Sequence, residues 1–213
     1  MTPRAFFAQH APLAQLLFQG TGLCASVTLA QAAIESGWGE SGLSKKYFNY
    51  GGIKDAWDWD GPVVRLNTRE VLAGKDVVIK DGFRVYQSLP DYYRGRLAFL
   101  RANPRYRGLF AADNYLSEAR LFQAAGYATD PHYAATLIRV VSRHELTKYD
   151  VVPGVTNPEL ARALFPLPAK AVQLHLNSIR GEQLKPDGII GPNTVAAINS
   201  THAAGLLTLP LHF

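Results

Sequence analysis

The 213-residue sequence has one cysteine, no long hydrophobic run and no common metal or phosphate motif. A single cysteine forms no internal disulfide, so the fold does not depend on an oxidising compartment. No stretch approaches the roughly 18 consecutive apolar residues of a membrane span, so we expect none. The six histidines lack zinc-protease spacing, and neither common glycine-rich phosphate motif occurs. These absences exclude a disulfide scaffold, a membrane channel and the commonest zinc and nucleotide enzymes.

The one cysteine, Cys24, has two chemical interpretations. Together with a distant histidine it could be the nucleophile of a thiol hydrolase. Its neighbours Leu23, Ala25 and Val27 are apolar, however, and apolar surroundings make a thiol unreactive. We therefore predict an inert, buried thiol.

The N-terminal residues 1–20 are apolar but do not match a signal peptide. Polar residues such as Gln9 and His10 interrupt the apolar run, and no small-x-small cleavage site follows it closely. We expect two short helices instead, with Pro3 and Pro12 each in a first helical turn. The prediction is a protein made in the cytoplasm that needs another route to act in the periplasm or cell wall.

The charge balance is basic, with 22 Lys and Arg against 17 Asp and Glu and a net charge of +5. Such a balance favours an anionic partner: nucleic acid, an acidic lipid surface or a cell-wall polymer. A cluster of five arginines could contact phosphates. We interpret it instead as a solvated helix face whose side-chain stems cover the core, and expect no nucleic-acid partner. The cluster comprises Arg94, Arg96, Arg101, Arg105 and Arg107.

The chain divides at residues 149–158, where two prolines and a glycine predict a linker. Residues 1–148 hold all three tryptophans and form the first predicted domain. Residues 159–213 are predicted to be a small helical segment. Its sequences VQL at 172–174 and DGIIGPNTVAAI at 187–198 resemble the end of a small helical peptidoglycan-binding module.

Hydrophobic periodicity predicts helices on both sides of a short β region. Val27, Ala30 and Ile34 have the spacing of a buried helical stripe, so we expect a helix over 26–36. Residues 61–87 contain short β-type runs, with turns expected at 73–76 and 80–82. Further helices are expected over 88–103, 115–125 and 130–146. The predicted fold class is α+β, mainly α, with a small β lobe.

Glu35 is the first catalytic candidate because it ends an otherwise apolar helix. The negative end of the helix dipole and apolar neighbours such as Ile34 and Trp38 would both raise the pKa of its carboxyl. A glycosidase keeps its general acid protonated near neutral pH in this way. A solvent-facing glutamate at a frayed helix end fits the same local sequence, and local physics leaves both interpretations open.

A glycosidase usually needs a second carboxylate, and several residues could supply it. Glu70 lies in a β-type run that could fold over a cleft, although most strand glutamates are simply exposed. Aspartates interleaved with Trp57 and Trp59 suit either sugar binding or an ordinary surface loop. The candidates are Glu40, Asp55, Asp58, Asp60, Glu70 and Asp130.

Five short sequence blocks between residues 25 and 146 stand out as possible family motifs. They are LAQAAIESGWG at 29–39, FNYGGIK at 48–54, FRVYQS at 83–88, NPRY at 103–106 and AGYATDPHYA at 125–134. The blocks and their order resemble the glucosaminidases of glycoside hydrolase family 73, which include the muralytic domain of the flagellar rod-cap protein. The resemblance implies a lysozyme-like domain with two lobes flanking a glycan groove.

The same resemblance implies roles for particular residues and needs no metal or organic cofactor. Glu35 falls on the family's general acid, and Glu70 on the ribbon glutamate that serves as the second catalytic group. Tyr127 and Tyr133 fall on tyrosines that bind or stabilise the reacting sugar. The predicted substrate-binding residues are Tyr127, Tyr133, Asn49, Trp38 and Trp57.

The sequence therefore predicts a monomeric peptidoglycan hydrolase that cleaves β-1,4 bonds of the glycan strand as an endo-β-N-acetylglucosaminidase. An N-acetylmuramidase is the alternative enzyme, and a non-catalytic cell-wall-binding protein is the alternative of another class. Two biological settings fit the prediction. One is an antibacterial type VI secretion effector, with a cognate immunity protein occluding the groove, and the other is a phage endolysin.

Overall fold

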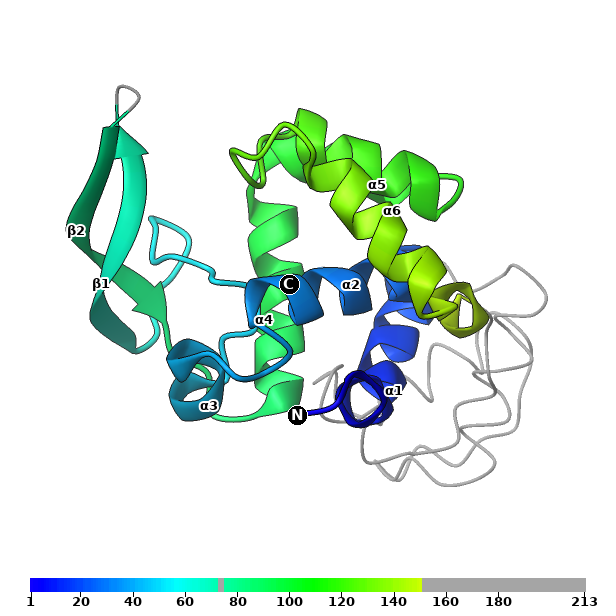
Figure 1. Ribbon diagram of the computed structural model, residues 1–213, viewed down its shortest axis with the longest axis horizontal. Helices are drawn as coiled ribbons and strands as arrows, with labels where there is room; N and C mark the ends of the chain where they lie inside the picture. The colour runs from blue at the N-terminus through cyan, green and yellow to red at the C-terminus, as the bar shows by residue number, and fades with distance from the viewer. Residues whose placement is uncertain (73–74, 151–213) are drawn as a thin grey trace, which may run out of the picture.

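The computed structural model describes residues 1–72 and 75–150 and is mainly helical, with one β hairpin (Figure 1). This arrangement confirms the predicted fold class. The segment 159–213, and the predicted linker beyond Asp150, lie outside the described residues. The elements are α1 (Pro3–Thr21), α2 (Ala25–Glu35), α3 (Gly42–Tyr47), β1 (Val63–Leu72), β2 (Lys75–Arg84), α4 (Leu89–Ala102), η1 (Pro104–Ala111), α5 (Tyr115–Ala124), α6 (Tyr133–Arg143) and η2 (Leu146–Tyr149). No helix of the described part is long and apolar enough to cross a membrane.

Helix α2 lies at the centre of the helical part and is buried along nearly its whole length. Its many alanines let α1, α5, α6 and η2 pack closely around it. Two distant carboxylates satisfy backbone N–H groups at its start, which have no partner within a helix. Glu118 accepts from Cys24 N at 2.6 Å, and Asp150 accepts from Ser26 N at 2.8 Å and from Ser26 Oγ at 2.6 Å. The predicted burial of Cys24 is confirmed.

Helix α1 is one helix, so the prediction of two short helices was wrong. Thr2 caps its start by accepting from Ala5 N, and Gly22, in the left-handed region at φ 77°, ends it. Pro12 lies inside the helix, where it removes one backbone donor. Packing of the apolar residues on both sides of Pro12 keeps the helix continuous.

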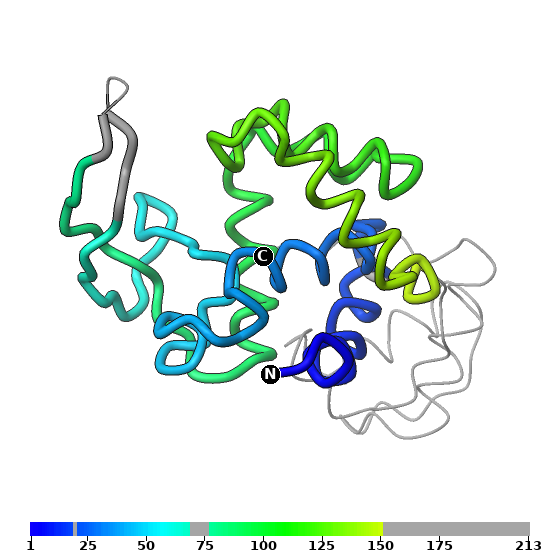
Figure 2. The backbone as a smooth tube through the Cα atoms, viewed as in Figure 1, coloured from blue at the N-terminus to red at the C-terminus, as the bar shows by residue number. Residues whose placement is uncertain are grey.

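Strands β1 and β2 form a single long antiparallel hairpin, paired from Val63 with Arg84 to Leu72 with Lys75. Figures 1 and 2 show it standing apart from helices α5 and α6. The predicted turn at 80–82 was wrong, because these residues lie within β2. Gly82 lies where the Asp55 carboxyl comes close to the strand backbone, since a Cβ there would lie 2.3 Å from Asp55 Oδ1.

Helix α4 begins at the predicted position, with Ser88 Oγ accepting from Asp91 N at 3.2 Å. One face of α4 is buried, including Tyr92, Tyr93 and Arg96. Gly95 lies against the buried ring of Tyr86, which therefore packs directly on the helix backbone.

We expect Gly95→Ala to destabilise the protein, although the same change in an open helix position stabilises it by about 1 kcal/mol. The added Cβ would lie 2.2 Å from Tyr86 Cε1, and this ring also contacts Trp59 and Tyr92. Overpacking of this kind costs about 1–3 kcal/mol in urea denaturation. Gly42→Ala is the control because its Cβ would have no described atom within 4 Å. Equal stability of the two variants would contradict the prediction.

Candidate active site

Glu35 is the last residue of α2, and a tight left-handed turn follows it. Gly37, Trp38 and Gly39 have φ values of 55°, 61° and 76°, a region that glycine adopts without strain. Ser36 Oγ donates to Ala32 O at 2.5 Å and accepts from Gly39 N at 2.8 Å. This turn ends the helix at Glu35 and fixes the position of its carboxyl.

The carboxyl of Glu35 accepts a hydrogen bond from a tyrosine that lies 98 residues further along the chain. Tyr133, the first residue of α6, donates its hydroxyl to Glu35 Oε1 at 2.8 Å. Burial raises the pKa of Glu35, and the hydrogen bond from Tyr133 partly offsets this rise. The direction expected from the sequence is confirmed. The ring of Trp38 packs instead against Phe7 and His144, at centroid distances of 5.5 and 5.2 Å.

Tyr127 stacks on Tyr133, with ring centroids 5.8 Å apart and an angle of 16° between the planes. Its hydroxyl donates to Gly51 O at 3.1 Å, which ties the loop after α3 to the loop before α6. Burial raises the pKa of both tyrosines, so both keep their protons at neutral pH. The structure thus brings together Glu35, Tyr127 and Tyr133, three of the residues predicted from the sequence.

Two further polar residues lie behind Tyr133. Gln31 Nε2 donates to the Tyr133 hydroxyl at 3.0 Å, and Arg96 Nη2 donates to Gln31 Oε1 at 2.5 Å. Both side chains are only 1% exposed, so the interpretation of Arg96 as part of a solvated face was wrong. Arg96 belongs to the buried face of α4, which the cluster of neighbouring arginines concealed. Gln31 could have been recognised as a polar residue one helical turn before Glu35 in an otherwise apolar helix.

The remaining predicted site residues lie in different surroundings. Asn49 is buried; its amide donates to Ile53 O at 2.8 Å and to Arg84 O at 2.9 Å, and its oxygen accepts from Ile53 N. Asn49 therefore braces the loop that carries Gly51. Trp57 is 79% exposed, and Glu70 lies on β1 opposite Val77, near the hairpin tip. Their roles in substrate binding or catalysis remain predictions.

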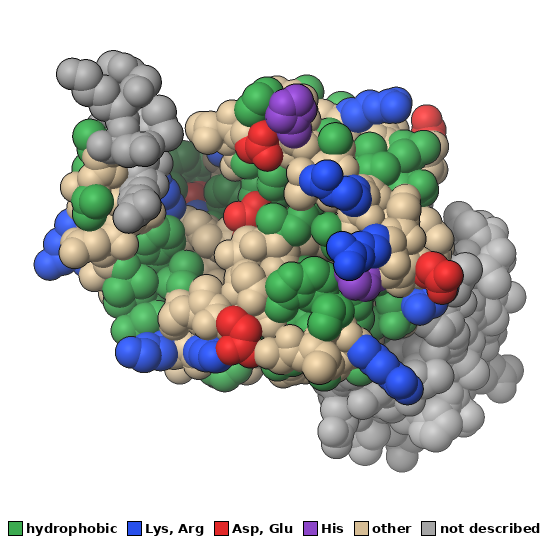
Figure 3. Space-filling model, in the orientation of Figure 1, with side chains coloured by type: hydrophobic (Ala, Val, Ile, Leu, Met, Phe, Trp, Pro, Cys, Tyr) green, Lys and Arg blue, Asp and Glu red, His purple; other side chains and the backbone are tan. Residues whose placement is uncertain are grey.

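Figure 3 shows the surface hollowed between the hairpin and the helical part. Helix α2, whose last residue is Glu35, runs toward the hairpin side of the molecule (Figure 1). The strand that carries Glu70 borders the hollow. The hollow has the position expected of a groove between the two lobes.

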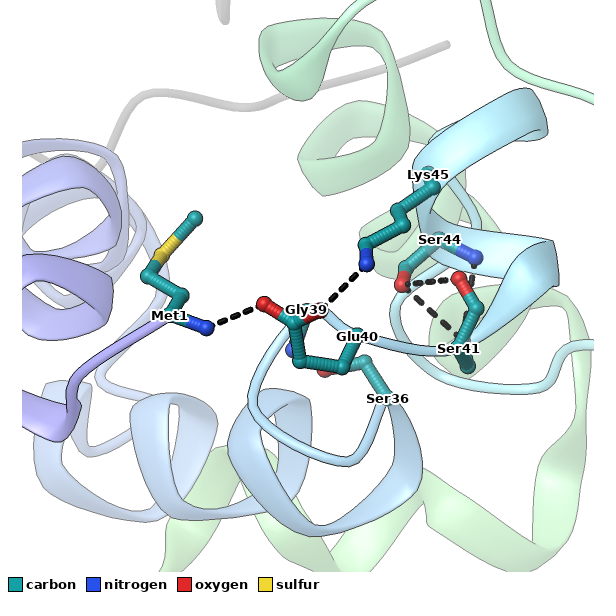
Figure 4. Close-up of polar contacts among 7 residues, drawn as sticks. All are labelled: Met1, Ser36, Gly39, Glu40, Ser41, Ser44 and Lys45. Atoms are coloured by element: carbon teal, nitrogen blue, oxygen red, sulfur yellow. Dashed lines mark hydrogen bonds and ion pairs between the residues drawn. The ribbon is translucent and has the colours of Figure 1, made fainter.

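Three other candidate carboxylates have local partners. Glu40 pairs with Lys45 and with the N-terminal amine of Met1, and the hydrogen bond from Lys45 is the main cause that lowers its pKa to about 2 (Figure 4). Asp58 is ion-paired with Arg84 at 2.7 Å in the interior. Asp130 accepts from His132 N at 2.8 Å just before α6. In residues 1–72 and 75–150, no group of three His, Cys, Asp or Glu side chains could hold a metal.

A helical domain with a partly buried glutamic acid at a helix end, together with a hairpin that borders a surface hollow, is a lysozyme-like glycoside hydrolase domain. The family model described as "Mannosyl-glycoprotein endo-beta-N-acetylglucosaminidase" matches residues 11–146, and the chain belongs to this glucosaminidase family. The family resemblance of the five sequence blocks is therefore confirmed.

Two relatives are enzymes that act on peptidoglycan or glucosaminide bonds by name, and each matches about two thirds of this chain. The peptidoglycan hydrolase FlgJ of Escherichia coli is 38% identical over 66% of this chain and 46% of its own length. The exo-glucosaminidase LytG of Bacillus subtilis is 36% identical over 69% of this chain and 52% of its own. The chain thus spans about half the length of these curated relatives.

A solved structure agrees with the fold. The catalytic domain of the autolysin Auto from Listeria monocytogenes superposes with a TM-score of 0.62 at 31% sequence identity. The match covers 69% of this chain and 86% of that domain. The match is thus confined to about the length of one catalytic domain.

Proposed function

We propose that this protein is a peptidoglycan hydrolase that cleaves β-1,4 glycosidic bonds of the glycan strand as an endo-β-N-acetylglucosaminidase. The observation that carries the proposal is the carboxyl of Glu35 at the end of α2, which accepts a hydrogen bond from Tyr133 and whose pKa is raised by burial. A carboxyl that remains protonated near neutral pH can donate a proton to a leaving group oxygen. Family membership and the peptidoglycan hydrolase FlgJ support the same substrate class.

In the proposed mechanism, Glu35 protonates the glycosidic oxygen as the bond to the sugar breaks. Glu70, or the acetamido group of the substrate, stabilises the oxocarbenium-like state or activates water. Tyr127, Asn49, Trp38 and Trp57 are the proposed substrate-binding residues. Tyr133 joins them and, through its bond to Glu35, also orients the acid.

The test is to digest purified sacculi, reduce the soluble products with borohydride and identify their reducing ends by mass spectrometry. We expect reduced N-acetylglucosamine ends and an early fall in strand length, because an endo-enzyme cuts within strands. Reduced muramic acid ends would establish an N-acetylmuramidase instead. Release of disaccharides from strand ends alone would contradict endo cleavage, and sacculus binding without release would establish the non-catalytic alternative.

For the setting, we propose an antibacterial secreted effector that acts as a monomer in the periplasm or wall of a target bacterium, with a phage endolysin as the alternative. The hollow between the hairpin and the helical part offers a concave surface that an immunity protein could occlude. We expect the product of a neighbouring gene to bind the protein and stop sacculus digestion. A neighbouring holin gene and no inhibitory partner would favour the endolysin.

A further inference from the structure

Three consecutive hydrogen bonds run from the protein interior to Glu35. Arg96 of α4 donates to Gln31 of α2 at 2.5 Å, Gln31 donates to the hydroxyl of Tyr133 at 3.0 Å, and Tyr133 donates to Glu35 Oε1 at 2.8 Å. Arg96, Gln31 and Tyr133 are at most 3% exposed. Water therefore has little access to these bonds, and each link is made by protein groups alone.

The direction of these bonds is set at Arg96. A guanidinium has donors and no acceptor, so Gln31 must turn its amide oxygen toward Arg96 and its NH₂ toward Tyr133. The hydroxyl of Tyr133 accepts from that NH₂ and directs its own single hydrogen to Glu35. Each donor in this series of three hydrogen bonds therefore points toward the carboxyl of Glu35.

Arg96 has more buried donors than hydrogen-bond partners, although its charge also interacts with Glu118. Its Nε and Nη1 atoms are buried without a hydrogen-bond partner among the described residues, and its guanidinium lies 5.7 Å from the ring centre of Phe122. A buried charge with few hydrogen bonds is costly. Its one side-chain hydrogen bond holds Gln31, which indicates a role in orienting that amide.

We propose that Gln31 and Arg96 are positioning residues which, through Tyr133, hold Oε1 of Glu35 as a permanent acceptor and leave the acid's transferable proton on Oε2. The proposal rests on the proposed function, in which Glu35 is the general acid. Oε1 of Glu35 already accepts a hydrogen bond from Tyr133, so it cannot also carry a proton that points toward Tyr133. The proton is therefore held on one oxygen before substrate binds, and that oxygen must face the glycosidic bond.

The sharpest test is Gln31→Glu, which changes one amide to a carboxylate of nearly the same shape. The new carboxylate accepts from Arg96 and also from Tyr133, so the hydroxyl hydrogen turns away from Glu35. With a donor lost and a negative charge added, the pKa of Glu35 rises, and we expect the basic limb of the pH–activity profile to move up by about one pH unit or more. We expect at least about a tenfold lower rate at the pH optimum, since a mispositioned acid loses much of its catalytic contribution.

Two further readouts separate positioning from folding and from the proposed function. A ¹³C NMR titration of the Glu35 carboxyl needs no activity, so it tests this series of hydrogen bonds even if sacculi are not the substrate. Arg96→Lys keeps a donor toward Gln31 and should restore the wild-type pH profile more closely than Arg96→Met. The control is Tyr86→Phe, which removes a buried hydroxyl that has no hydrogen-bond partner in the described part of the chain.

The proposal is overturned if Gln31→Glu leaves both the basic limb and the NMR titration of Glu35 where they are in the wild type. It is also overturned if only Tyr133→Phe shifts them, since Tyr133 would then act alone. Should Gln31→Glu not fold, Gln31→Leu removes the same donor without adding charge, and the same two measurements decide.

Discussion

We expect Glu35→Gln to reduce sacculus digestion by roughly a hundred- to ten-thousandfold, the range that a general acid contributes. Glutamine has no transferable proton at this position, yet it keeps the size of the side chain and can still accept from Tyr133. Because the pKa of Glu35 is raised by burial, an uncharged amide suits the site, and folding is preserved. The measurements are soluble muropeptide release and the thermal midpoint of the variant.

The matched control is Glu40→Gln, five residues further along the chain. Glu40 is half-exposed and paired with Lys45 and the N-terminal amine, so its loss should leave digestion near the wild-type rate (Figure 4). Substantial digestion by a folded Glu35→Gln protein would refute the assignment of the acid.

Glu70→Gln in the same assay tests whether Glu70 is the second catalytic carboxylate. A rate close to wild type would remove Glu70 from the mechanism.

The second large effect concerns stability and comes from Glu118, a carboxyl that is fully buried beside the start of α2. Burial raises its pKa in the folded protein from the usual 4.5 to about 7. The folded state then binds more protons than the unfolded state between these values, so the free energy of unfolding falls as pH rises through this window. The loss amounts to about 3 kcal/mol once the pH is above 7.

We expect Glu118→Gln to remove this loss. The amide oxygen can still accept from Cys24 N, and no charge develops in the interior at high pH. Urea denaturation should give similar stabilities for variant and wild type near pH 5, and a variant that is more stable by about 3 kcal/mol at pH 8.5.

Comparison of variant and wild type at each pH cancels the contributions of the other titrating groups to the free energy of unfolding. These include His10, whose pKa is lowered by burial to about 3 and whose contribution to stability rises with pH. The control variant is Glu145→Gln, which makes the same substitution at an exposed position. A Glu118→Gln variant that is no more stable at pH 8.5 than wild type would show that Glu118 does not titrate near neutrality.

Local patterns in the sequence predicted the helices well and irregular features poorly. The buried stripe of α2 and the Ser88 cap of α4 follow from side-chain spacing and capping chemistry, which act within one or two turns. Pro12 and Gly82 were misread as the boundaries of elements because each is locally typical of a break. In both cases tertiary packing overrides the local preference: apolar neighbours keep α1 continuous, and Asp55 occupies the space beside Gly82.

The sequence by itself determined the family, the order of the elements and the suspicion that Glu35 is an acid, because motif order and apolar spacing are properties of the chain. Only the tertiary structure decided what surrounds that acid. Tyr133 lies 98 residues from Glu35 and Arg96 lies 65 residues from Gln31, so no local pattern could pair them. Their contacts exist because α6 packs on α2 and because the side chain of Arg96 reaches from α4 to Gln31, which turns an arginine assigned to the surface into a buried donor that points toward the acid.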